Sequence, residues 1–219
     1  MIVRVWDAPT RVFHWSLAVC FIGLIVSAQI GGAAMAWHFR LGFTVLTLLL
    51  WRLIWGFQGG VWSRFASFVY SPAHSWQFLR GTIQPHDSVG HNPLGAWSVI
   101  AMLGFLLLQV SSGMLSDDEI SASGPLTRFV SESIVGYATF YHRQIGKLML
   151  LFLVVMHLCA IAIYFFKKHE NLVKPMIFGD KTLDFKAPSS SDTSTDRRRA
   201  ATILIACAAF VALGLQLVA

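Results

Sequence analysis

The sequence contains few charged residues. Asp, Glu, Lys and Arg make up 13% of its 219 residues, whereas soluble domains average about 25%. Hydrophobic residues account for 55%, and the mean hydropathy is +0.61. This composition excludes a disordered chain and argues against an ordinary cytosolic enzyme. It indicates a membrane protein.

Cysteine is also scarce, and its positions exclude two kinds of structure. Cys20, Cys159 and Cys207 each lie inside an apolar run, so we expect no disulfide framework. The sequence Cys-x-x-Cys-His is absent as well, which excludes covalently attached c-type haem. No nucleotide-binding loop, nucleophile triad or nucleic-acid module is present, so nucleic acid is not an expected partner.

Five apolar stretches reach the length of about 20 residues that a helix needs to cross a bilayer. They cover residues 13–30, 37–57, 96–115, 142–166 and 200–219, and none contains Asp or Glu. The first two are joined by a short Gly/Ala stretch, so we expect them to be antiparallel neighbours. The sequence therefore predicts an all-α fold with a transmembrane four-helix bundle over 1–180. A polar flexible linker over 181–199 and a fifth C-terminal transmembrane helix over 200–219 follow it.

The distribution of Lys and Arg outside the spans predicts the orientation of the chain. With the N-terminus inside, the inner segments carry twelve Lys and Arg, whereas the outer segments carry only Arg128. We therefore expect a cytoplasmic N-terminus and a periplasmic C-terminus. One alternative is a cleaved signal peptide over 13–36, because Ala34-Met35-Ala36 is typical of a cleavage site.

The long inner loop over 58–95 is rich in aromatic residues. Aromatic side chains with a polar edge prefer the headgroup level of a bilayer, so we expect this loop to lie on the membrane surface. The aromatic residues are Trp62, Phe65, Phe68, Tyr70, Trp76 and Phe78.

Four histidines lie in or at the ends of the spans, where ionisable residues are costly and indicate function. His38 and His142 open their spans at the outer face, and His14 opens the first span at the inner face. His157 follows His142 by 15 residues, about 22 Å along a helix and about 60° around it. The histidines therefore form an inner and an outer pair, and each pair suits the two axial positions of one b-type haem iron.

Glycines and arginines near these histidines fit two haems. Gly42 and Gly146 follow a histidine by one helical turn, where the missing side chain leaves room for a flat macrocycle. Arg52 is expected on the face of His38 at the inner level, where a haem propionate needs a cation. Further candidates for that role are Arg40 and Arg143 at the outer level and Arg11 at the inner level.

Two simpler interpretations stand beside these. A lone transmembrane histidine usually forms a hydrogen bond between helices, and the glycines are also typical of close helix packing. The histidines outside the two pairs are interpreted as surface residues. They are His74, His86, His91 and His169.

These residues resemble a known family, the bacterial cytochrome b561 and nickel–iron hydrogenase cytochrome b group. The matching features are Val5-Trp6-Asp7-Ala8-Pro9-Thr10-Arg11-Val12-Phe13-His14-Trp15, His38-x-x-x-Gly42, Arg52-Leu53-Ile54-Trp55, His142-x-x-x-Gly146-Lys147 and His157. The resemblance covers residues 1–180 and implies a four-helix core with two non-covalent b haems. It implies electron transport in the respiratory chain of the bacterial inner membrane, between quinone and a periplasmic hydrogenase or c-type cytochrome. The fifth span departs from this pattern and leaves the partner open.

Irons with both axial positions filled favour outer-sphere electron transfer over chemistry on oxygen or substrate. The first hypothesis is therefore a dihaem electron carrier between quinone and a c-type cytochrome, acting as a quinone oxidoreductase. The second is a membrane anchor that passes electrons from a hydrogenase to quinone. A His-lined metal-ion transporter and a structural anchor are further alternatives, although metal pathways recruit carboxylates that these spans lack. Membrane lipid and a second copy of the chain in a homodimer complete the expected partners, and the acidic outer loop over 116–141 is a candidate docking surface.

Overall fold

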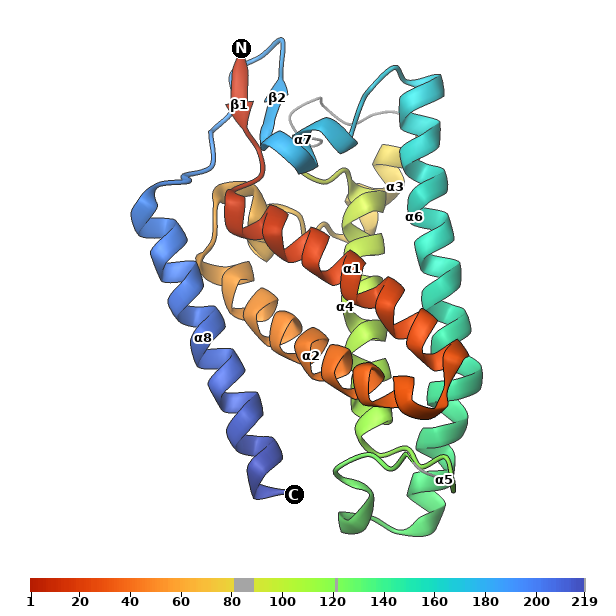
Figure 1. The fold of residues 1–219 in the computed structure, drawn as a ribbon. Coiled ribbons are helices and arrows are strands. Elements are labelled where there is room, and N and C mark those ends of the chain that lie inside the picture. Colours follow the sequence, from red (N-terminus) through yellow and green to blue (C-terminus); the bar gives the residue numbers. More distant parts are fainter. Residues whose placement is uncertain (81–88, 121, 219) are drawn as a thin grey trace. The chain divides into compact units, whose positions relative to one another are not determined.

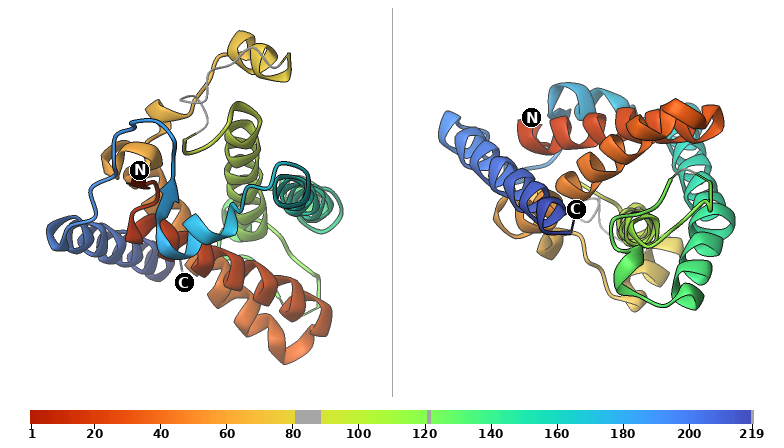
Figure 2. Two further views of the ribbon diagram at one scale, coloured as in Figure 1. Left: turned by 90° about the horizontal axis from the view of Figure 1, so that it is seen from above. Right: turned by 60° about the horizontal axis from the view of Figure 1, so that its bottom comes forward.

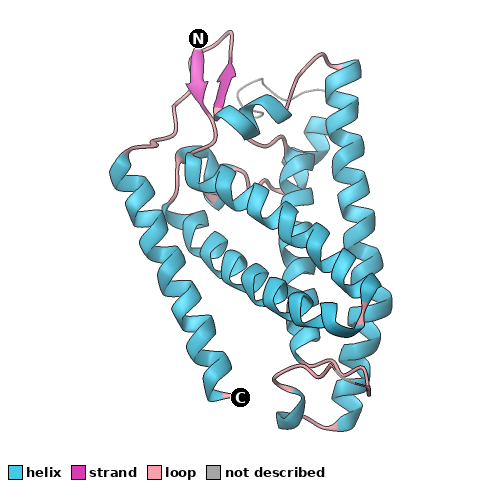
Figure 3. Ribbon diagram, in the orientation of Figure 1, coloured by secondary structure: helices cyan, strands magenta, loops and turns pink. Residues whose placement is uncertain are grey.

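The computed structural model describes residues 1–80, 89–120 and 122–218, which are mostly helical (Figure 1, Figure 3). Among these residues, five helices are long and apolar enough to cross a membrane. They are Ala8–Ile30, Gly32–Gln58, Pro93–Met114, Glu132–Lys167 and Ser194–Leu217. The predicted all-α transmembrane fold, with a fifth C-terminal span, is confirmed.

Short elements connect the long helices. The long helices are α1 (Ala8–Ile30), α2 (Met35–Gln58), α4 (Pro93–Met114), α6 (Lys147–Lys167) and α8 (Ser194–Leu217). The shorter ones are α3 (Pro72–Leu79), α5 (Glu132–Phe140), α7 (Val173–Phe178), the 3-10 turns η1 (Gly32–Ala34), η2 (Val61–Ser63), η3 (Phe65–Ser67) and η5 (Thr127–Phe129), and the π-helical turn η6 (Tyr141–Gly146). The strands β1 (Ile2–Arg4) and β2 (Asp180–Thr182) pair antiparallel, with Val3 opposite Lys181.

The chain divides into two compact units, each assembled from segments that are far apart in the sequence. The first unit contains Met1–His14, Arg52–Ala101 and Val155–Thr202. The second contains Trp15–Trp51, Met102–Val154 and Ile203–Ala219. Each long helix therefore contributes one part to the first unit and one part to the second.

The first unit has a small hydrophobic core around its N-terminal strand. β1 pairs with β2, and α7 lies directly before β2 in the chain (Figure 1, Figure 2). Val3 and Val5 point into the core from one face, because side chains of an extended chain alternate between two faces, and Trp6 joins them after the strand. The buried members are Val3, Val5, Trp6, Val89 and Leu183, with Trp62 and Met176 packed against them.

A buried carboxylate joins the start of α1 to the end of α2. Asp7 has no exposed surface. Its Oδ1 accepts hydrogen bonds from the backbone N–H of Thr10 at 2.7 Å and from Trp55 Nε1 at 3.3 Å. Its Oδ2 accepts from the backbone N–H of Gly60 at 2.9 Å and from Ser63 Oγ at 2.7 Å. Asp7 thus caps α1 and holds the turn after α2, and its charge is fully hydrogen-bonded.

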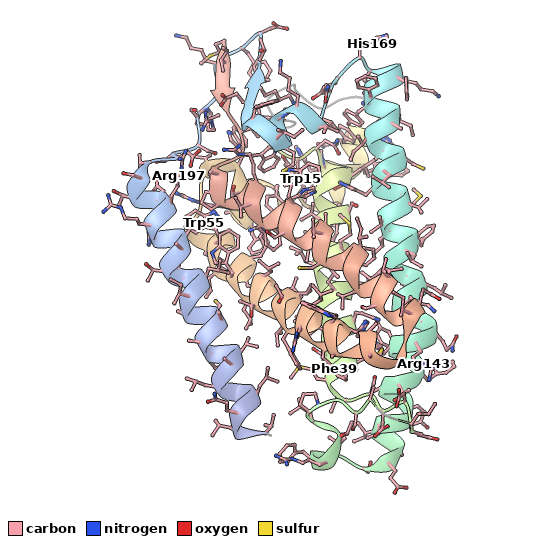
Figure 4. The ribbon with its side chains drawn as sticks, in the orientation of Figure 1. Trp15, Phe39, Trp55, Arg143, His169 and Arg197 are labelled. Carbon is pink, nitrogen blue, oxygen red and sulfur yellow. The ribbon has the colours of Figure 1, made fainter. Side chains whose placement is uncertain are left out.

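Hydrogen bonds and ion pairs connect the segment between β2 and α8 to the N-terminus. Ser190 Oγ donates to the carbonyl of Val5 at 2.9 Å. The Asp192 carboxylate pairs with Arg4 at 2.8 Å and with Arg197 at 2.9 Å, and Figure 4 shows Arg197 at the start of α8. Burial by itself would raise the pKa of the Asp192 carboxyl, but hydrogen bonds, first from Arg197, lower it below its ordinary value. The linker predicted over 181–199 thus includes β2, these contacts and the first turns of α8.

The second unit contains the larger parts of α1 and α2, which run antiparallel. Gly31 and Gly32 have φ angles of +66° and +51° in the turn between these helices, a conformation that glycine adopts without steric cost. A Cβ at Gly23 would lie 2.7 Å from Leu41, so the missing side chain lets the two helices approach closely. The expected antiparallel arrangement of the first two spans is confirmed.

The spans begin earlier than their hydropathy predicts. α1 starts at Ala8 rather than at 13, and α8 starts at Ser194 rather than at 200. The fourth span starts at Glu132 rather than at 142. Apolar runs locate the part of a helix that lies in hydrocarbon, but polar residues extend a helix equally well when their backbone hydrogen bonds are satisfied.

The first part of the loop over 58–95 packs against protein, and its expected place on the membrane surface stays a prediction. Phe68 is only 1% exposed, and Trp62 packs against the core of the first unit. Phe65 and Phe68 lie against the guanidinium of Arg52. These aromatic rings therefore pack against other protein groups.

Candidate metal centres

Two of the predicted histidines face each other in the first unit. His14 lies in α1, almost two turns after its start, and His157 lies in α6. Their ring centroids are 6.4 Å apart, and the ring planes are inclined by 52°. Both side chains are half-buried. The structure thus brings together the pair that the sequence predicts for the inner level.

The other two histidines face each other in the second unit. His38 lies in the first turn of α2, and His142 lies in η6. Their ring centroids are 6.1 Å apart, and the ring planes are inclined by 82°. Figure 4 labels Trp15 and Arg143, which directly follow His14 and His142 in the sequence. Both predicted pairs are therefore present, one in each unit.

The second pair is oriented by main-chain carbonyls. The Nδ1 of His38 donates to the carbonyl of Leu24 at 3.1 Å, and the Nδ1 of His142 donates to the carbonyl of Gln109 at 2.9 Å. Ser27 and Ser112 lie beside the same two Nδ1 atoms, at 3.3 and 3.4 Å. Because Nδ1 carries the donated proton, each Nε2 keeps its lone pair for a metal ion.

The distance between the rings in each pair fits one six-coordinate metal ion. A bond from a metal to an imidazole nitrogen is about 2 Å long, so two imidazoles on opposite sides of one ion have centroids about 6 Å apart. The observed distances of 6.4 and 6.1 Å match this spacing. No group of three or more His, Cys, Asp or Glu that could hold a metal ion occurs in the described ranges. The candidate donors are therefore two pairs of imidazoles.

Local backbone features position His142. It lies in a π-helical turn, and such turns are frequent at functional sites. The angular offset of about 60° predicted for an unbroken α-helix therefore does not apply across this turn. Gly113 of α4 lies directly against the imidazole, because a Cβ at this position would be 2.7 Å from His142 Cε1 and 3.0 Å from its Nδ1. Sequence reasoning missed Gly113, which follows Gln109 by one helical turn.

The two glycines predicted to make room for a macrocycle have different surroundings. A Cβ at Gly42 would meet nothing within 4 Å, so the space beside this residue is open. A Cβ at Gly146 would overlap Gln109 Oε1 and would lie 2.8 Å from Tyr141. Gly146 is therefore in close contact with α4, and the role of both glycines toward a cofactor stays a prediction.

Arg52 is a buried cation in the first unit. Its side chain is 3% exposed, and its guanidinium lies 4.8 Å from the centroid of Phe65 and 6.0 Å from that of Phe68. Its Nη1 is buried and has no hydrogen-bond acceptor among the residues that the structure describes. A buried guanidinium requires an anionic or polar partner. The residue thus fits the predicted role of holding a propionate carboxylate.

The other three predicted cations have different environments. Arg11 donates from Nη1 to the carbonyl of Ile177 at 2.6 Å and lies 3.7 Å from Asp192. Arg40 is exposed and lies 5.0 Å above the ring of Trp37. Arg143 is exposed in an open cleft of about 820 Å³ in the second unit. That cleft is also lined by Asp117, Glu119, Thr127, Arg128 and Glu132. Arg11 already has protein partners, so Arg52 is the stronger candidate in its unit.

His91 is half-buried, so its interpretation as a surface residue holds only in part. Its ring packs between Trp6 and Phe68, with centroid distances of 4.7 and 4.6 Å, and its Nδ1 is buried. The motif that contains Trp6 is a recognisable sequence signal, but no sequence pattern connects Trp6 with His91. His169 is exposed, as predicted, and His74 is half-buried and stacks on Tyr70. His86 lies outside the described residues.

Comparisons with known proteins identify relatives of this chain. The probable Ni/Fe-hydrogenase B-type cytochrome subunit of Rhodobacter capsulatus is 24% identical over 217 residues, covering 82% of this chain and 81% of the relative. The corresponding subunit of Bradyrhizobium diazoefficiens is 23% identical over 218 residues, covering 82% and 85%. The probable Ni/Fe-hydrogenase 1 B-type cytochrome subunit of Escherichia coli K12 is 28% identical over 132 residues, covering 48% and 55%. No solved structure matches.

A family model describes the larger part of the chain. It matches residues 5–179 and carries the description prokaryotic cytochrome b561. The match includes all four paired histidines and Arg52, and it ends before α8. With five helices that are apolar enough to span a membrane, this chain belongs to the prokaryotic cytochrome b561 family of multi-pass membrane cytochromes, whose b-type character implies haem b.

Proposed function

We propose that this chain is a dihaem b-type cytochrome that carries electrons across the bacterial cytoplasmic membrane between quinone and a periplasmic redox partner. The observation that supports it best is the pair of imidazole-to-imidazole distances, 6.4 Å in the first unit and 6.1 Å in the second. In this proposal, His14 and His157 bind the iron of an inner haem. His38 and His142 bind the iron of an outer haem.

The protein groups around each iron have separate roles in this proposal. A b haem with two imidazole ligands supplies one-electron transfer without an open position for oxygen or substrate. The carbonyls of Leu24 and Gln109 hold His38 and His142 in the tautomer with a free Nε2. Arg52 neutralises a propionate carboxylate inside the first unit, and Arg40 and Arg143 stay candidates for the outer haem.

The membrane and the orientation are part of the same proposal. Twelve Lys and Arg lie in the segments assigned to the inside, and Arg128 alone lies in the opposite ones. This asymmetry supports a cytoplasmic N-terminus and a periplasmic C-terminus. With the inner pair near the cytoplasm and the outer pair near the periplasm, each electron that crosses works with or against the membrane potential, about 2.3 kcal/mol per 100 mV.

A hydrogenase is the partner that the relatives favour. The three relatives described above are named as probable cytochrome subunits of Ni/Fe-hydrogenases. The second candidate function is therefore a membrane anchor that receives electrons from a hydrogenase and passes them to quinone. The charged cleft around Glu119, Glu132 and Arg143 offers groups for docking a periplasmic protein. Reduction of the purified chain by hydrogen in the presence of its cognate hydrogenase, but not by a reduced c-type cytochrome, would select this candidate.

The haem content tests the central proposal directly. We expect the purified chain to show sharp b-type absorption bands on reduction and to contain two haems per polypeptide. We also expect a quinol to reduce both haems, because the proposed function makes them members of one electron-transfer chain. A colourless preparation, or one haem per polypeptide in fully loaded protein, would overturn the proposal.

Gly113 offers a test of the outer site in which none of the proposed ligand residues is substituted. We expect Gly113→Ala to lower the haem content from two toward one per polypeptide. The new Cβ would lie only 2.7 Å from Cε1 of His142, so the imidazole ring would have to move away. The matched control is Gly104→Ala in the same helix, where a Cβ meets nothing within 4 Å. The control should keep both haems. Equal haem contents in the two variants would show that Gly113 does not position His142.

A further inference from the structure

His91 lies between two aromatic rings in the first unit, which also contains the proposed inner site. Its imidazole lies between Trp6 and Phe68, and its backbone carbonyl accepts a hydrogen bond from Tyr70 Oη at 3.2 Å. The ring is therefore fixed from both sides and through its main chain. Its Nδ1 is buried without a hydrogen-bond partner in residues 1–80, 89–120 and 122–218.

Arg52 lies beside the same aromatic ring as His91. The guanidinium carbon of Arg52 is 6.0 Å from the centroid of Phe68, and the imidazole centroid of His91 is 4.6 Å from it. Both residues bury a nitrogen for which the described residues provide no hydrogen-bond partner. Buried donors are almost always hydrogen-bonded. Two such nitrogens beside one ring make this region a candidate site for a group that completes their hydrogen bonds.

The charge state of His91 narrows the kind of ligand. Burial, followed by the positive charge of Arg52, lowers the pKa of His91 to about 3. The imidazole is thus neutral near pH 7 and contributes a hydrogen bond without a second positive charge. One guanidinium with one neutral donor suits a single carboxylate, which has one negative charge and two acceptor oxygens.

We propose that His91 donates a hydrogen bond, beside Arg52, to a propionate carboxylate of the haem held by His14 and His157. This inference rests on the proposed function, because it requires a haem at that pair. All four residues, His14, His157, Arg52 and His91, belong to the first unit. His91 is therefore a positioning residue for the inner haem and not an axial ligand.

Two substitutions of His91 test the inference in the full-length, haem-loaded chain. His91→Phe keeps an aromatic ring between Trp6 and Phe68 but removes the donor, and His91→Gln restores a donor on a smaller side chain. We expect His91→Phe to keep two haems, to shift the resonance Raman propionate-bending mode and to lower the midpoint potential of one haem only. We expect His91→Gln to reverse both changes in part. The exposed His169→Phe is the control and should match the wild type.

The outcomes separate this inference from the proposed function. A wild-type chain without two haems overturns the proposed function, whatever the His91 variants show. Two haems with an unchanged propionate mode in His91→Phe overturn the role of His91 alone. His91→Phe could instead leave the propionate-bending mode unchanged and weaken the binding of a quinone analogue. In that case the acceptor is a quinone oxygen, and the inference is wrong. If His91→Phe does not fold, His91→Gln is compared with the wild type. A donor in a new position must shift the propionate-bending mode, so an unchanged mode in His91→Gln overturns the role of His91.

Discussion

Replacing His157 by Ala should remove one of the two haems and leave the other bound. Each proposed pair lies within one unit, so the loss of one ligand in the first unit leaves His38 and His142 of the second unit unchanged. An iron that loses one of two axial imidazoles is held much more weakly in a non-covalent site. We therefore expect the haem-to-polypeptide ratio to fall from two to one, measured as the pyridine haemochrome of purified protein.

A matched set of variants makes this result specific. His38→Ala should remove the other haem, and the double variant should be colourless. His169→Ala removes an exposed histidine outside both pairs and should retain two haems. Loss of both haems in folded His157→Ala protein, or of neither, would contradict the pairing of His157 with His14.

Replacing Asp7 by Asn should destabilise the whole first unit. Four donors converge on the two carboxylate oxygens, and the negative charge also acts on the buried Arg52. An amide has only one acceptor oxygen, so at least two donors would face an NH2 group. The loss of buried, charge-assisted hydrogen bonds and of the anion near a buried cation costs about 3 kcal/mol or more. For a chain of this size we expect the melting temperature to fall by about 10 °C.

Thermal unfolding in detergent, followed by circular dichroism, measures this effect. Asp184→Asn is the matched control, because Asp184 is exposed in the same unit. It should change the melting temperature by no more than about 1 °C. Equal melting temperatures for the two variants would show that the hydrogen bonds of Asp7 contribute little to stability.

Much of the fold and of the candidate site follows from local sequence patterns. The apolar stretches without Asp or Glu identify the five spans, because burying charge in hydrocarbon is costly whatever the tertiary contacts are. The same argument singles out His14, His38, His142 and His157 within those spans. Their assignment to an inner and an outer pair needs only the direction of each helix and its rise per residue.

Other features depend on contacts that no local pattern encodes. His91 and Phe68 lie in a loop whose composition is typical of a membrane surface, but Phe68 is buried beside Arg52 and His91 is half-buried against Trp6. Asp7 lies 48 residues from Trp55 and 53 from Gly60, so its hydrogen-bond partners cannot be identified from spacing. Tertiary structure also determines the place of Gly113, which matters only because His142 of another helix packs against it.

The sequence by itself thus determined how many helices cross the membrane and which imidazoles are available, because both follow from the cost of transferring each residue into hydrocarbon. The tertiary structure alone decided which buried donors converge around Phe68, which carbonyls orient His38 and His142, and which carboxylate caps α1. These choices depend on side chains that are distant in sequence and meet only when the helices pack, where a buried polar group must find a partner.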